Sequence, residues 1–408
     1  MLLVQKFGGT SVADPDRIRA VADHVARTRR AGDDVVVVVS AMGKSTDDLL
    51  RLAHDVAEHP GGRELDMLLT AGERISMALV SMAVEALGVA AMSFTGSQAG
   101  IVTNTEHNRA KIIEIKGDRI REALAEGKVA IVAGFQGVST AREITTLGRG
   151  ASDLTAVALA AALDAEVCEI YTDVEGVYSA DPRIVPKARK LPRVSFDEML
   201  EMAATGGRVL ALRSVEFARN HHVQVHVRSS FTWAPGTWVT EEDPSLTSME
   251  QAILSGVTHD ASEAKVTIEQ VPDRPGVAAT WFRALADAGV NVDMIVQNVS
   301  TAGRTDISFT VPRTDLSRAE SCMDKIVVET EATGYRTDAR IGRVSLIGAG
   351  MKTNPGVAAQ MFEVLAAEGI NIEMISTSTI RISCVVAEDD VEPAVRALHT
   401  AFGLDGAS

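Results

Sequence analysis

The chain has 408 residues, of which 46% are hydrophobic and 23% are charged, and its formal net charge is −15. This length exceeds what one ordinary hydrophobic core serves, so two or three domains are expected. The acidic balance argues against binding of a nucleic-acid backbone, which requires a basic face, but it permits a nucleotide site built from local amides and a few basic side chains.

The first 231 residues alternate apolar β-branched runs with amphipathic stretches. Strands are predicted over residues 2–6, 35–40, 90–94, 129–133, 166–171 and 223–228. Helices are predicted over residues 15–29, 46–58, 65–87, 118–126 and 153–163. The second strand begins with five consecutive valines, as expected of a strand that is covered on both faces. This alternation predicts an α/β domain over residues 1–231.

A polar stretch with Pro235, Gly236 and Pro244 follows, and residues 232–250 are expected to form a linker. Beyond the linker the chain repeats itself, because Pro275-Gly276-Val277 recurs as Pro355-Gly356-Val357 within similar surroundings. Each copy predicts a strand, a Pro-Gly turn, a helix and a strand. Two copies indicate a duplicated small domain rather than a solenoid, with one copy over residues 251–340 and the other over residues 341–408.

Cysteine usage and the N-terminus bear on the compartment. The three cysteines, Cys168, Cys322 and Cys384, are widely separated, which favours a reducing compartment over a disulfide framework. The charged Lys6 lies close to the N-terminus, and the longest apolar run, residues 154–163, is about half a membrane span. We therefore expect a cytoplasmic protein that binds neither membranes nor nucleic acid.

The first predicted strand runs into Lys6, Phe7, Gly8, Gly9, Thr10 and Ser11. Two consecutive glycines allow backbone amides to approach a phosphate closely, and the hydroxyls of Thr10 and Ser11 can add donors. Lys6 would place its ammonium over the same oxygens. For a Gly-Gly pair alone, a tight strand-to-helix turn with a solvated lysine is the simpler interpretation.

Three more polar segments are candidates for the site, two of them directly after predicted strands, and ligands of parallel sheets collect outside the carboxyl ends of strands. The loop that starts at Ser40 follows the second strand. Arg149 suits bidentate capture of a substrate carboxylate, whereas Ser152 or Asp153 suits an ordinary helix N-cap, and the two interpretations of this turn stay evenly balanced. The polar loop over residues 172–178 can hold a purine and a ribose, although in isolation it is a generic surface loop.

Together these motifs resemble the aspartate kinases, most closely those of the actinobacterial type. The segments that carry the resemblance, in chain order, are KFGGTSV, SAMG, LLTAGERIS, SFTGSQAG, IVAGFQGV, TTLGRG, EIYTDVEGVYSADPRIV and the paired PGV repeats. The resemblance runs nearly end to end. It implies an amino-acid-kinase fold, an open and largely parallel sheet between helix layers, followed by two α+β ACT domains. Elements can interleave in such enzymes, so the strand near residues 252–257 can belong to the second ACT unit.

The resemblance also implies an activity and a role for individual residues. The implied reaction moves the γ-phosphate of ATP, with Mg²⁺ bridging its phosphates, onto the β-carboxylate of L-aspartate, as the first step towards lysine, threonine and methionine or in a specialised branch. The implied catalytic residues are Lys6 and Asp153. The implied aspartate-binding residues are Ser40, Thr46, Glu73, Arg149 and Ser152. The implied nucleotide-binding residues are Gly8, Gly9, Thr10, Thr172, Asp173, Tyr178, Arg183 and Arg208. The implied effector-pocket residues, for lysine or threonine, are Asp273, Gly276, Ala278, Asp293, Gln297, Asn371 and Thr379. No side-chain metal site is expected.

Several residues depart from the family pattern. Ala151 replaces a glycine, Leu154 replaces a threonine, and Arg208 replaces a lysine near the ATP phosphates. Thr379 stands where a carboxylate would pair with the side chain of lysine, so lysine inhibition is expected to be weak or absent. These departures suggest a specialised paralogue.

Two other interpretations stay open. The chain can be another amino-acid kinase of the same fold, such as an N-acetylglutamate or glutamate kinase, because a fold alone does not fix the substrate. It can also be a regulatory amino-acid-binding subunit whose kinase domain has decayed, an interpretation that Ala151 and Arg208 favour. ACT units bury sheet edges by pairing, so a homodimer or larger homo-oligomer is expected. In the expected catalytic cleft, Lys6 and Arg149 face each other.

Overall fold

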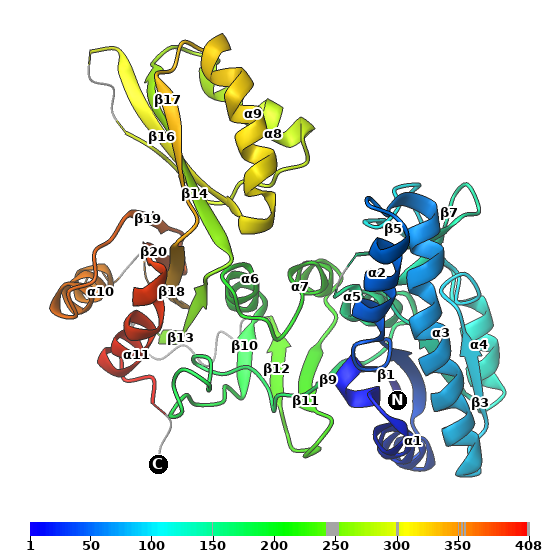
Figure 1. The fold of residues 1–408 in the computed structure, drawn as a ribbon. Coiled ribbons are helices and arrows are strands. Elements are labelled where there is room, and N and C mark those ends of the chain that lie inside the picture. The colour runs from blue at the N-terminus through cyan, green and yellow to red at the C-terminus, as the bar shows by residue number, and fades with distance from the viewer. Residues whose placement is uncertain are drawn as a thin grey trace. The chain divides into compact units, whose positions relative to one another are not determined.

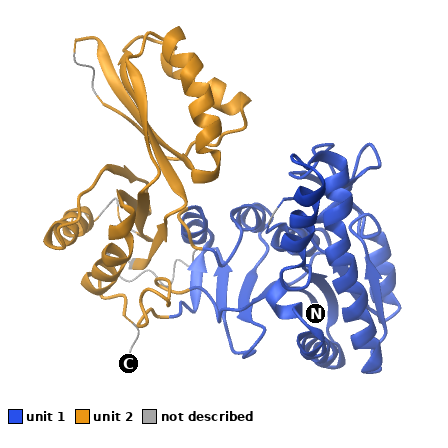
Figure 2. Ribbon diagram, viewed as in Figure 1, with its two compact units in different colours: residues 1–177, 190–204, 208–247 blue, residues 178–189, 205–207, 248–408 orange. Residues whose placement is uncertain are grey.

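The computed structural model describes residues 1–148, 150–241, 253–298, 302–349, 351, 354 and 356–405. The chain divides into two compact units (Figure 2). Unit 1 comprises residues 1–177, 190–204 and 208–247, and unit 2 comprises residues 178–189, 205–207 and 248–408. Two short segments that precede residue 208 therefore belong to unit 2.

Unit 1 is built on an eight-stranded sheet in the order β10-β12-β11-β9-β1-β2-β6-β3 (Figure 1). Its strands are β1 (Leu2–Phe7), β2 (Asp34–Val39), β3 (Ala91–Phe94), β6 (Val129–Ala133), β9 (Val167–Thr172), β10 (Arg193–Ser195), β11 (Val225–Ser229) and β12 (Thr237–Thr240). Neighbouring strands are parallel except β11 and β12. The predicted largely parallel sheet is confirmed.

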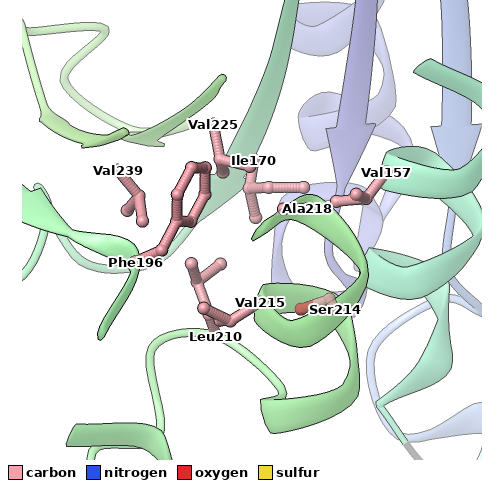
Figure 3. A pocket seen from close by; sticks show the side chains of 9 residues that line it. All are labelled: Val157, Ile170, Phe196, Leu210, Ser214, Val215, Ala218, Val225 and Val239. Carbon is pink, nitrogen blue, oxygen red and sulfur yellow. The ribbon is translucent and has the colours of Figure 1, made fainter. Parts of the chain in front are cut away.

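Helices cover both faces of this sheet. Alternate side chains of a strand point to opposite faces, so apolar strands such as β2 need cover on both. The helices of unit 1 are α1 (Pro15–Arg30), α2 (Ser45–Val56), α3 (Gly62–Ala86), α4 (Asp118–Ala125), α5 (Ala151–Ala162), α6 (Phe196–Ala204) and α7 (Leu212–Asn220). On one face, Val25 of α1 and Val84 of α3 share a core cluster with Val37 of β2. On the other face, Val157 of α5 lies against Ile170 of β9 (Figure 3).

An apolar gap lies on the second face among α5, α6, α7 and the strands β9, β11 and β12 (Figure 3). Phe196, Leu210 and Val225 are among its lining residues, and Ser214 is the polar one. The gap has no volume that a water molecule can enter. It is a feature of core packing and does not serve as a ligand site.

A second, smaller sheet of unit 1 has the order β5-β4-β7-β8. Its strands are β4 (Ile101–Thr103), β5 (Ile112–Ile115), β7 (Gln136–Ser139) and β8 (Ile144–Thr146). These strands were not predicted, because runs of three or four residues are too short to show a hydrophobic period. The stretch expected as a linker over residues 232–250 is not linker throughout, since β12 lies in it and joins the large sheet; residues 242–250 lie outside the described part of the chain.

Helix α3 has the length and apolar composition of a membrane-spanning helix. However, half of its most apolar window is buried, and Val80 and Val84 pack against the large sheet. The polar residues Asp66 and Glu73 are also buried in the interior of unit 1. Core helices pass the same length and composition test, and the packing of α3 is that of a core helix.

Unit 2 holds two antiparallel four-stranded sheets, in the orders β13-β18-β20-β19 and β15-β16-β14-β17. Their strands are β13 (Ile253–Asp260), β14 (Glu263–Pro272), β15 (Ile295–Gln297), β16 (Arg304–Pro312), β17 (Gly334–Asp338), β18 (Ile341–Ala349), β19 (Met374–Thr377) and β20 (Arg381–Ala387). The helices are α8 (Val277–Asp287), α9 (Leu316–Glu329), α10 (Gly356–Ala367) and α11 (Val391–Ala401). Because β13 pairs with β18, the expected interleaving of the two small domains is confirmed.

Charged side chains connect the two sheets of unit 2. Arg343 of β18 is almost fully buried and forms ion pairs with Glu263 at 2.9 Å and with Asp293. Lys265 of β14 pairs with Glu373. A small apolar cluster, which includes Met294 and Met374, accompanies these pairs. The two sheets are therefore joined by buried charge as well as by apolar contact.

Candidate active site

Four adjacent parallel strands, in the order β9-β1-β2-β6, bring their carboxyl ends to one edge of the large sheet. A backbone hydrogen bond connects the residue after β1, β2 and β6 to the end of the neighbouring strand. The amide of Gly8 donates to the carbonyl of Tyr171 at 3.2 Å, the amide of Ser40 donates to Phe7 at 3.1 Å, and the amide of Gly134 donates to Val39 at 3.0 Å. The loops predicted to handle phosphate thus lie side by side, as the sheet topology requires.

The glycine loop lies tightly against the loop after β2. A Cβ atom on Gly9 would come within 3.0 Å of the Ala41 carbonyl oxygen and 3.1 Å of that of Gly43. The amide of Gly43 donates to the carbonyl of Gly9 at 3.0 Å. Gly9 is therefore required by the close approach of the two loops, a reason that the sequence alone did not reveal.

The two hydroxyls of the glycine loop differ in what they can do. Ser11 is fully buried, and its hydroxyl lies 2.8 Å from that of Ser230 after β11. Arg17 of α1 donates to the carbonyl and hydroxyl oxygens of Ser230, which connects the ends of α1 and β11. Thr10 is exposed at the surface of the loop. Thr10 can therefore contact a phosphate, whereas the Ser11 hydroxyl is used in a buried hydrogen bond with Ser230.

Lys6 and Asp153 form the central ion pair of the site. Lys6 Nζ lies 2.6 Å from Asp153 Oδ1, and each side chain is 11% exposed. The pair is held by charge and proximity, because Asp153 Oδ1 makes no hydrogen bond of good angle. Lys6 Nζ also lies over Gly8, 3.5 Å from where a Cβ atom of that residue would be. The lysine therefore faces the glycine loop and the start of α5 at once.

The start of α5 is closely packed and has no side-chain cap. Gly150, in a left-handed conformation, is the N-cap of α5, so the expectation that Ser152 or Asp153 caps this helix is wrong. Ser152 instead lies against Gly134, where an added Cβ atom would come within 2.7 Å of its hydroxyl. Because Gly150 turns the chain at the N-cap without a side-chain cap, the Asp153 side chain faces Lys6 instead of capping the helix.

Arg149 lies outside the described residues, so the predicted opposition of Lys6 and Arg149 remains a prediction. Its neighbours Gly148 and Gly150 both have positive φ, 96° and 75° respectively. Asp153, four residues further on, lies beside Lys6. The turn expected to bind substrate thus leads directly into the helix that contacts the glycine loop.

Glu73 of α3 is buried beside the loop after β2. Its Oε1 accepts the amide of Ala41 at 3.2 Å, while its Oε2 has no hydrogen-bond partner among the described residues. Burial raises the pKa of Glu73 to about 7. Gly72 permits this approach, since a Cβ atom there would lie 2.8 Å from that of Ala41. Ser40, just before Ala41, and Thr46, in the first turn of α2, are both half-buried.

The residues predicted to bind nucleotide are divided between the two units. Thr172 and Asp173 follow β9 in unit 1, where the hydroxyl of Thr172 donates to Asp173 at 3.1 Å, and Arg208 is exposed before α7. Tyr178 and Arg183 belong to unit 2, where Arg183 pairs with Asp181 at 2.6 Å and holds the pKa of that carboxyl below its usual value. Their joint role stays a prediction.

The segment of unit 2 that contains Tyr178 is fixed by a buried set of polar groups. The hydroxyl of Ser179 lies 2.9 Å from His399 Nε2, and His399 Nδ1 lies 3.1 Å from Asp405 Oδ1. Although this order of groups is that of a hydrolytic triad, Ser179 and His399 are fully buried. The Ser179 hydroxyl also accepts the amide of Arg189. This is a structural connection that holds residues 178–189 to the C-terminal helix.

A polar and aromatic network that sequence reasoning missed lies below the strand ends of unit 1. Glu169 of β9 accepts hydrogen bonds from Gln5 at 2.8 Å, Tyr171 at 3.0 Å and Arg228 at 2.9 Å. His24 lies 2.8 Å from the Tyr171 hydroxyl, and burial lowers its pKa to about 4. The network joins β1, β9 and β11. Sequence motifs did not predict it, because its members are far apart along the chain.

Unit 2 contains an open pocket of about 310 Å³ around the first Pro-Gly turn. Four of the predicted effector residues, Asp273, Gly276, Ala278 and Gln297, line this pocket. The other three predicted residues lie elsewhere. Asp293 pairs with Arg343, and Asn371 and Thr379 are exposed near β19. Among the described residues, no group of three or more His, Cys, Asp or Glu side chains is placed to hold a metal ion.

Comparisons with known proteins agree with this architecture. The model of the amino acid kinase family matches residues 1–229, and the ACT domain model matches residues 266–325 and 344–402. The chain is 58% identical to an aspartokinase of Mycolicibacterium smegmatis and 56% identical to one of Corynebacterium glutamicum. Each alignment covers 408 residues, 99% of this chain and 97% of the relative.

Solved structures support the same assignment. E. coli aspartokinase III in complex with aspartate and ADP (R-state) matches with a TM-score of 0.83 at 26% identity, over 99% of this chain and 100% of that chain. The same enzyme in complex with lysine and aspartate (T-state) matches with a TM-score of 0.73 at 26% identity, over 98% of this chain and 99% of that chain. The predicted resemblance is confirmed, and the chain belongs to the aspartokinases of the amino acid kinase family, with ACT domains following the kinase domain.

Proposed function

We propose that the site around Lys6 and Asp153 catalyses transfer of the γ-phosphate of ATP to the β-carboxylate of L-aspartate, giving 4-phospho-L-aspartate. The observation that carries this proposal is the 2.6 Å approach of these two residues beside the glycine loop, within a family of aspartokinases. A carboxylate is already an adequate nucleophile, so the protein contributes mainly positioning and charge neutralisation.

The phosphate side of the site is formed by the glycine loop. The amide of Gly9 and the hydroxyl of Thr10 bind phosphate oxygens. Gly8, whose amide already donates to Tyr171, leaves room for the Lys6 ammonium, which neutralises charge that develops on the transferring group. Thr172, Asp173 and Arg208 of unit 1 complete the nucleotide site in this proposal. Mg²⁺ commonly binds substrate phosphates with one or two carboxylates, and Asp153 at the phosphate edge fits that donor set. When bound, the ion supplies charge neutralisation between the phosphates.

The aspartate side is formed by α3 and the turn before α5. The unpartnered Oε2 of Glu73 fits the ammonium of the substrate, since a buried acceptor without a donor is costly until one arrives. Arg149 binds the α-carboxylate as a bidentate partner. Ser40, Thr46 and Ser152 contribute hydroxyl donors around the substrate. This arrangement leaves the β-carboxylate directed towards the phosphate side.

The pocket of unit 2 is proposed as an amino-acid effector site, with lysine or threonine as candidates. Its lining by Asp273 and Gln297 offers a carboxylate and an amide to a small polar ligand. The edge strands β15 and β19 expose Ile295 and Ile375, which supports pairing of two chains as a homodimer or larger homo-oligomer. The substrates and the free Cys168, Cys322 and Cys384 support a cytoplasmic location.

Hydroxamate trapping of the acyl phosphate tests the reaction. Purified protein is incubated with ATP, Mg²⁺ and hydroxylamine, together with aspartate, glutamate or N-acetylglutamate in separate reactions. The expected result is ATP-dependent product with aspartate only. Product with glutamate or N-acetylglutamate in its place would reassign the substrate, and no turnover with any of them would favour a regulatory protein with a decayed kinase domain.

A further inference from the structure

Helix α3 carries a line of buried polar residues that contact the loop after β2, the strand β7 and the loop at residues 107–108. Asp66, Thr70 and Glu73 are four and three positions apart, which places them on one face of the helix. All three are buried. Glu73 contacts the loop after β2, and the carbonyl of Thr70 accepts the side-chain amide of Gln136 in β7. The contacts of Asp66, at the start of the helix, have no role in the site described so far.

Asp66 has no exposed surface, yet it is well supplied with donors. His107 Nδ1 lies 2.7 Å from its Oδ2, and both the amide and the side chain of Asn108 donate to its Oδ1, at 3.1 Å and 2.7 Å. The hydroxyl of Thr146 also donates to Oδ1. Because burying a carboxylate is costly unless its oxygens are hydrogen-bonded, this set of contacts fixes the 107–108 loop and the end of β8 relative to α3.

The end of β8 is the beginning of the turn that leads to α5. The carbonyl of Thr146 accepts the amide of Ala110 at 2.9 Å, and the carbonyl of Leu147 accepts Arg213 Nη1 at 2.7 Å. The carbonyl oxygen of Asn108 lies 3.5 Å from where a Cβ atom of Gly148 would be. Asp66 therefore holds Thr146 directly and lies behind the contact of Asn108 with Gly148, while Arg213 holds Leu147.

We infer that Asp66 is a positioning residue for aspartate binding. The inference rests on the proposed function, in which the turn after β8 and Glu73 bind the two ends of the same small substrate. Asp66 connects that turn to the helix that carries Glu73, so it sets the distance between them. The glycine loop is held by its own backbone bonds to Gly43 and Tyr171, in which Asp66 takes no part. Loss of the Asp66 contacts therefore weakens aspartate binding and leaves nucleotide binding intact.

The test compares Asp66→Asn and Thr146→Val with Thr28→Val as a matched control. Asp66→Asn keeps the shape and one acceptor oxygen, and Thr146→Val removes one hydroxyl without changing volume. Thr28 makes a hydroxyl-to-carbonyl bond within α1, to His24. We expect the KM for aspartate to rise about tenfold in Asp66→Asn, which removes the charge and one acceptor oxygen, and about fivefold in Thr146→Val, which removes one donor to Asp66 and leaves the others in place. The KM for ATP should stay within about twofold in all three variants.

Calorimetric titrations with aspartate and with ADP give the same comparison without turnover. A rise in both KM values together, or a loss of kcat with an unchanged KM for aspartate, would overturn the positioning role. So would equal effects in Thr28→Val. If Asp66→Asn does not fold, Thr146→Val alone decides. Failure of the wild-type protein to phosphorylate aspartate would count against the proposed function, whereas a normal wild type without the split in the variants counts against this inference only.

Discussion

The Lys6 ammonium lies 2.6 Å from the Asp153 carboxylate, so a single ion pair joins the strand that precedes the glycine loop to the helix that follows the substrate turn. Both side chains are largely buried. An ammonium held in this way is already oriented before the nucleotide arrives, and preorganised charge is the main means by which a phosphoryl-transfer site lowers its barrier. Asp153 in this view orients Lys6 and limits its motion.

Replacement of Lys6 by alanine should lower kcat by about 10²- to 10³-fold, the loss typical of one preorganised charge-stabilising donor. The KM for aspartate should change little, because Lys6 acts on the phosphoryl group. Steady-state kinetics with both substrates measure the two effects. Thr10→Ala, which removes an exposed hydroxyl of the same loop, serves as the control and should reduce kcat far less. A variant in which only the KM for aspartate rises would contradict the role of Lys6.

Aspartate binding should depend on the ionisation of Glu73, whose pKa burial raises to about 7. Below that pH the protonated carboxyl no longer accepts the substrate ammonium, so the KM for aspartate should rise by up to about tenfold per pH unit. Kinetics between about pH 5.5 and 8.5 test this. The KM for ATP should stay flat, and Glu73→Gln should show a high and pH-independent KM for aspartate. A pH-independent KM in the wild type would remove Glu73 from the substrate site.

Ionisation of Glu73 also changes the free energy of unfolding, and it does so in the direction opposite to its effect on aspartate binding. The folded pKa of Glu73 lies above the unfolded value of 4.5, so the folded protein binds more protons over this range. Its contribution to stability is therefore complete below pH 4.5 and is lost as the pH rises through about 7. Raising the pH through about 7 therefore strengthens aspartate binding but removes the stabilising contribution of Glu73. Shifted pKa values of this kind are common at functional sites.

The strand ends of unit 1 could be predicted from the sequence because long apolar runs mark buried parallel strands, and parallel strands place their following loops at one edge. That reasoning located Lys6, the glycine loop and the loop at Ser40. The interleaving of β13 with β18 also followed from the resemblance. Local patterns were therefore sufficient to place these loops at one edge of the sheet, whereas their role in binding phosphate stays a prediction.

Contacts between segments far apart in sequence could not be predicted in this way. The burial of Ser11 depends on Ser230, and the need for Gly9 depends on the Ala41 and Gly43 carbonyls. The predicted cap of α5 was also wrong. Ser152 and Asp153 are good capping residues, but Ser152 packs against Gly134 and Asp153 pairs with Lys6. Tertiary packing decided each of these positions against the local preference.

Reversion of Ala151 to glycine should not improve the enzyme. The sequence raised the concern that this position needs a glycine, but Ala151 is the first residue of α5, has no positive φ, and is buried among apolar residues. Ala151→Gly should therefore lower the free energy of unfolding by about 0.5–1 kcal/mol through loss of helix propensity and of a buried methyl group. Denaturant titration and kcat measure the outcome. A rise in kcat of several-fold would show that the methyl group obstructs the substrate.

Lysine should bind weakly, because Thr379 offers no carboxylate to its side-chain ammonium. Thr379 is exposed between β19 and β20, so a longer acidic side chain can be placed there without disturbing the core. Thr379 does not line the pocket around the first Pro-Gly turn, so this prediction concerns a lysine site near β19. We expect Thr379→Glu to strengthen lysine binding there by about tenfold, the gain of one charge-assisted contact. Calorimetry with lysine measures this, and threonine is the comparison ligand. Thr377→Glu, at an exposed position of β19, is the control. Tight lysine binding by the wild type would contradict the expectation.

Removal of Arg343 should destabilise unit 2 in a pH-dependent manner. Arg343 is 1% exposed and pairs with Glu263, which is also buried. Burial raises the pKa of Glu263 to about 7, and the Arg343 charge opposes that rise. Arg343→Met should cost about 3–5 kcal/mol at pH 8, because a buried carboxylate loses its partner. The cost should be smaller at about pH 6, where Glu263 without its partner takes up a proton and is neutral in the folded protein.

Chemical unfolding of unit 2 at the two pH values measures this effect, and two further variants make it specific. Arg340→Met removes an exposed pair with Asp389 close by and should have little effect at either pH. Arg343→Met combined with Glu263→Gln should recover most of the loss at pH 8, because no buried charge is then left without a partner. If the double variant is as unstable as the single one, the arginine acts through its packing and its other contacts, and the charge of Glu263 is not the cause.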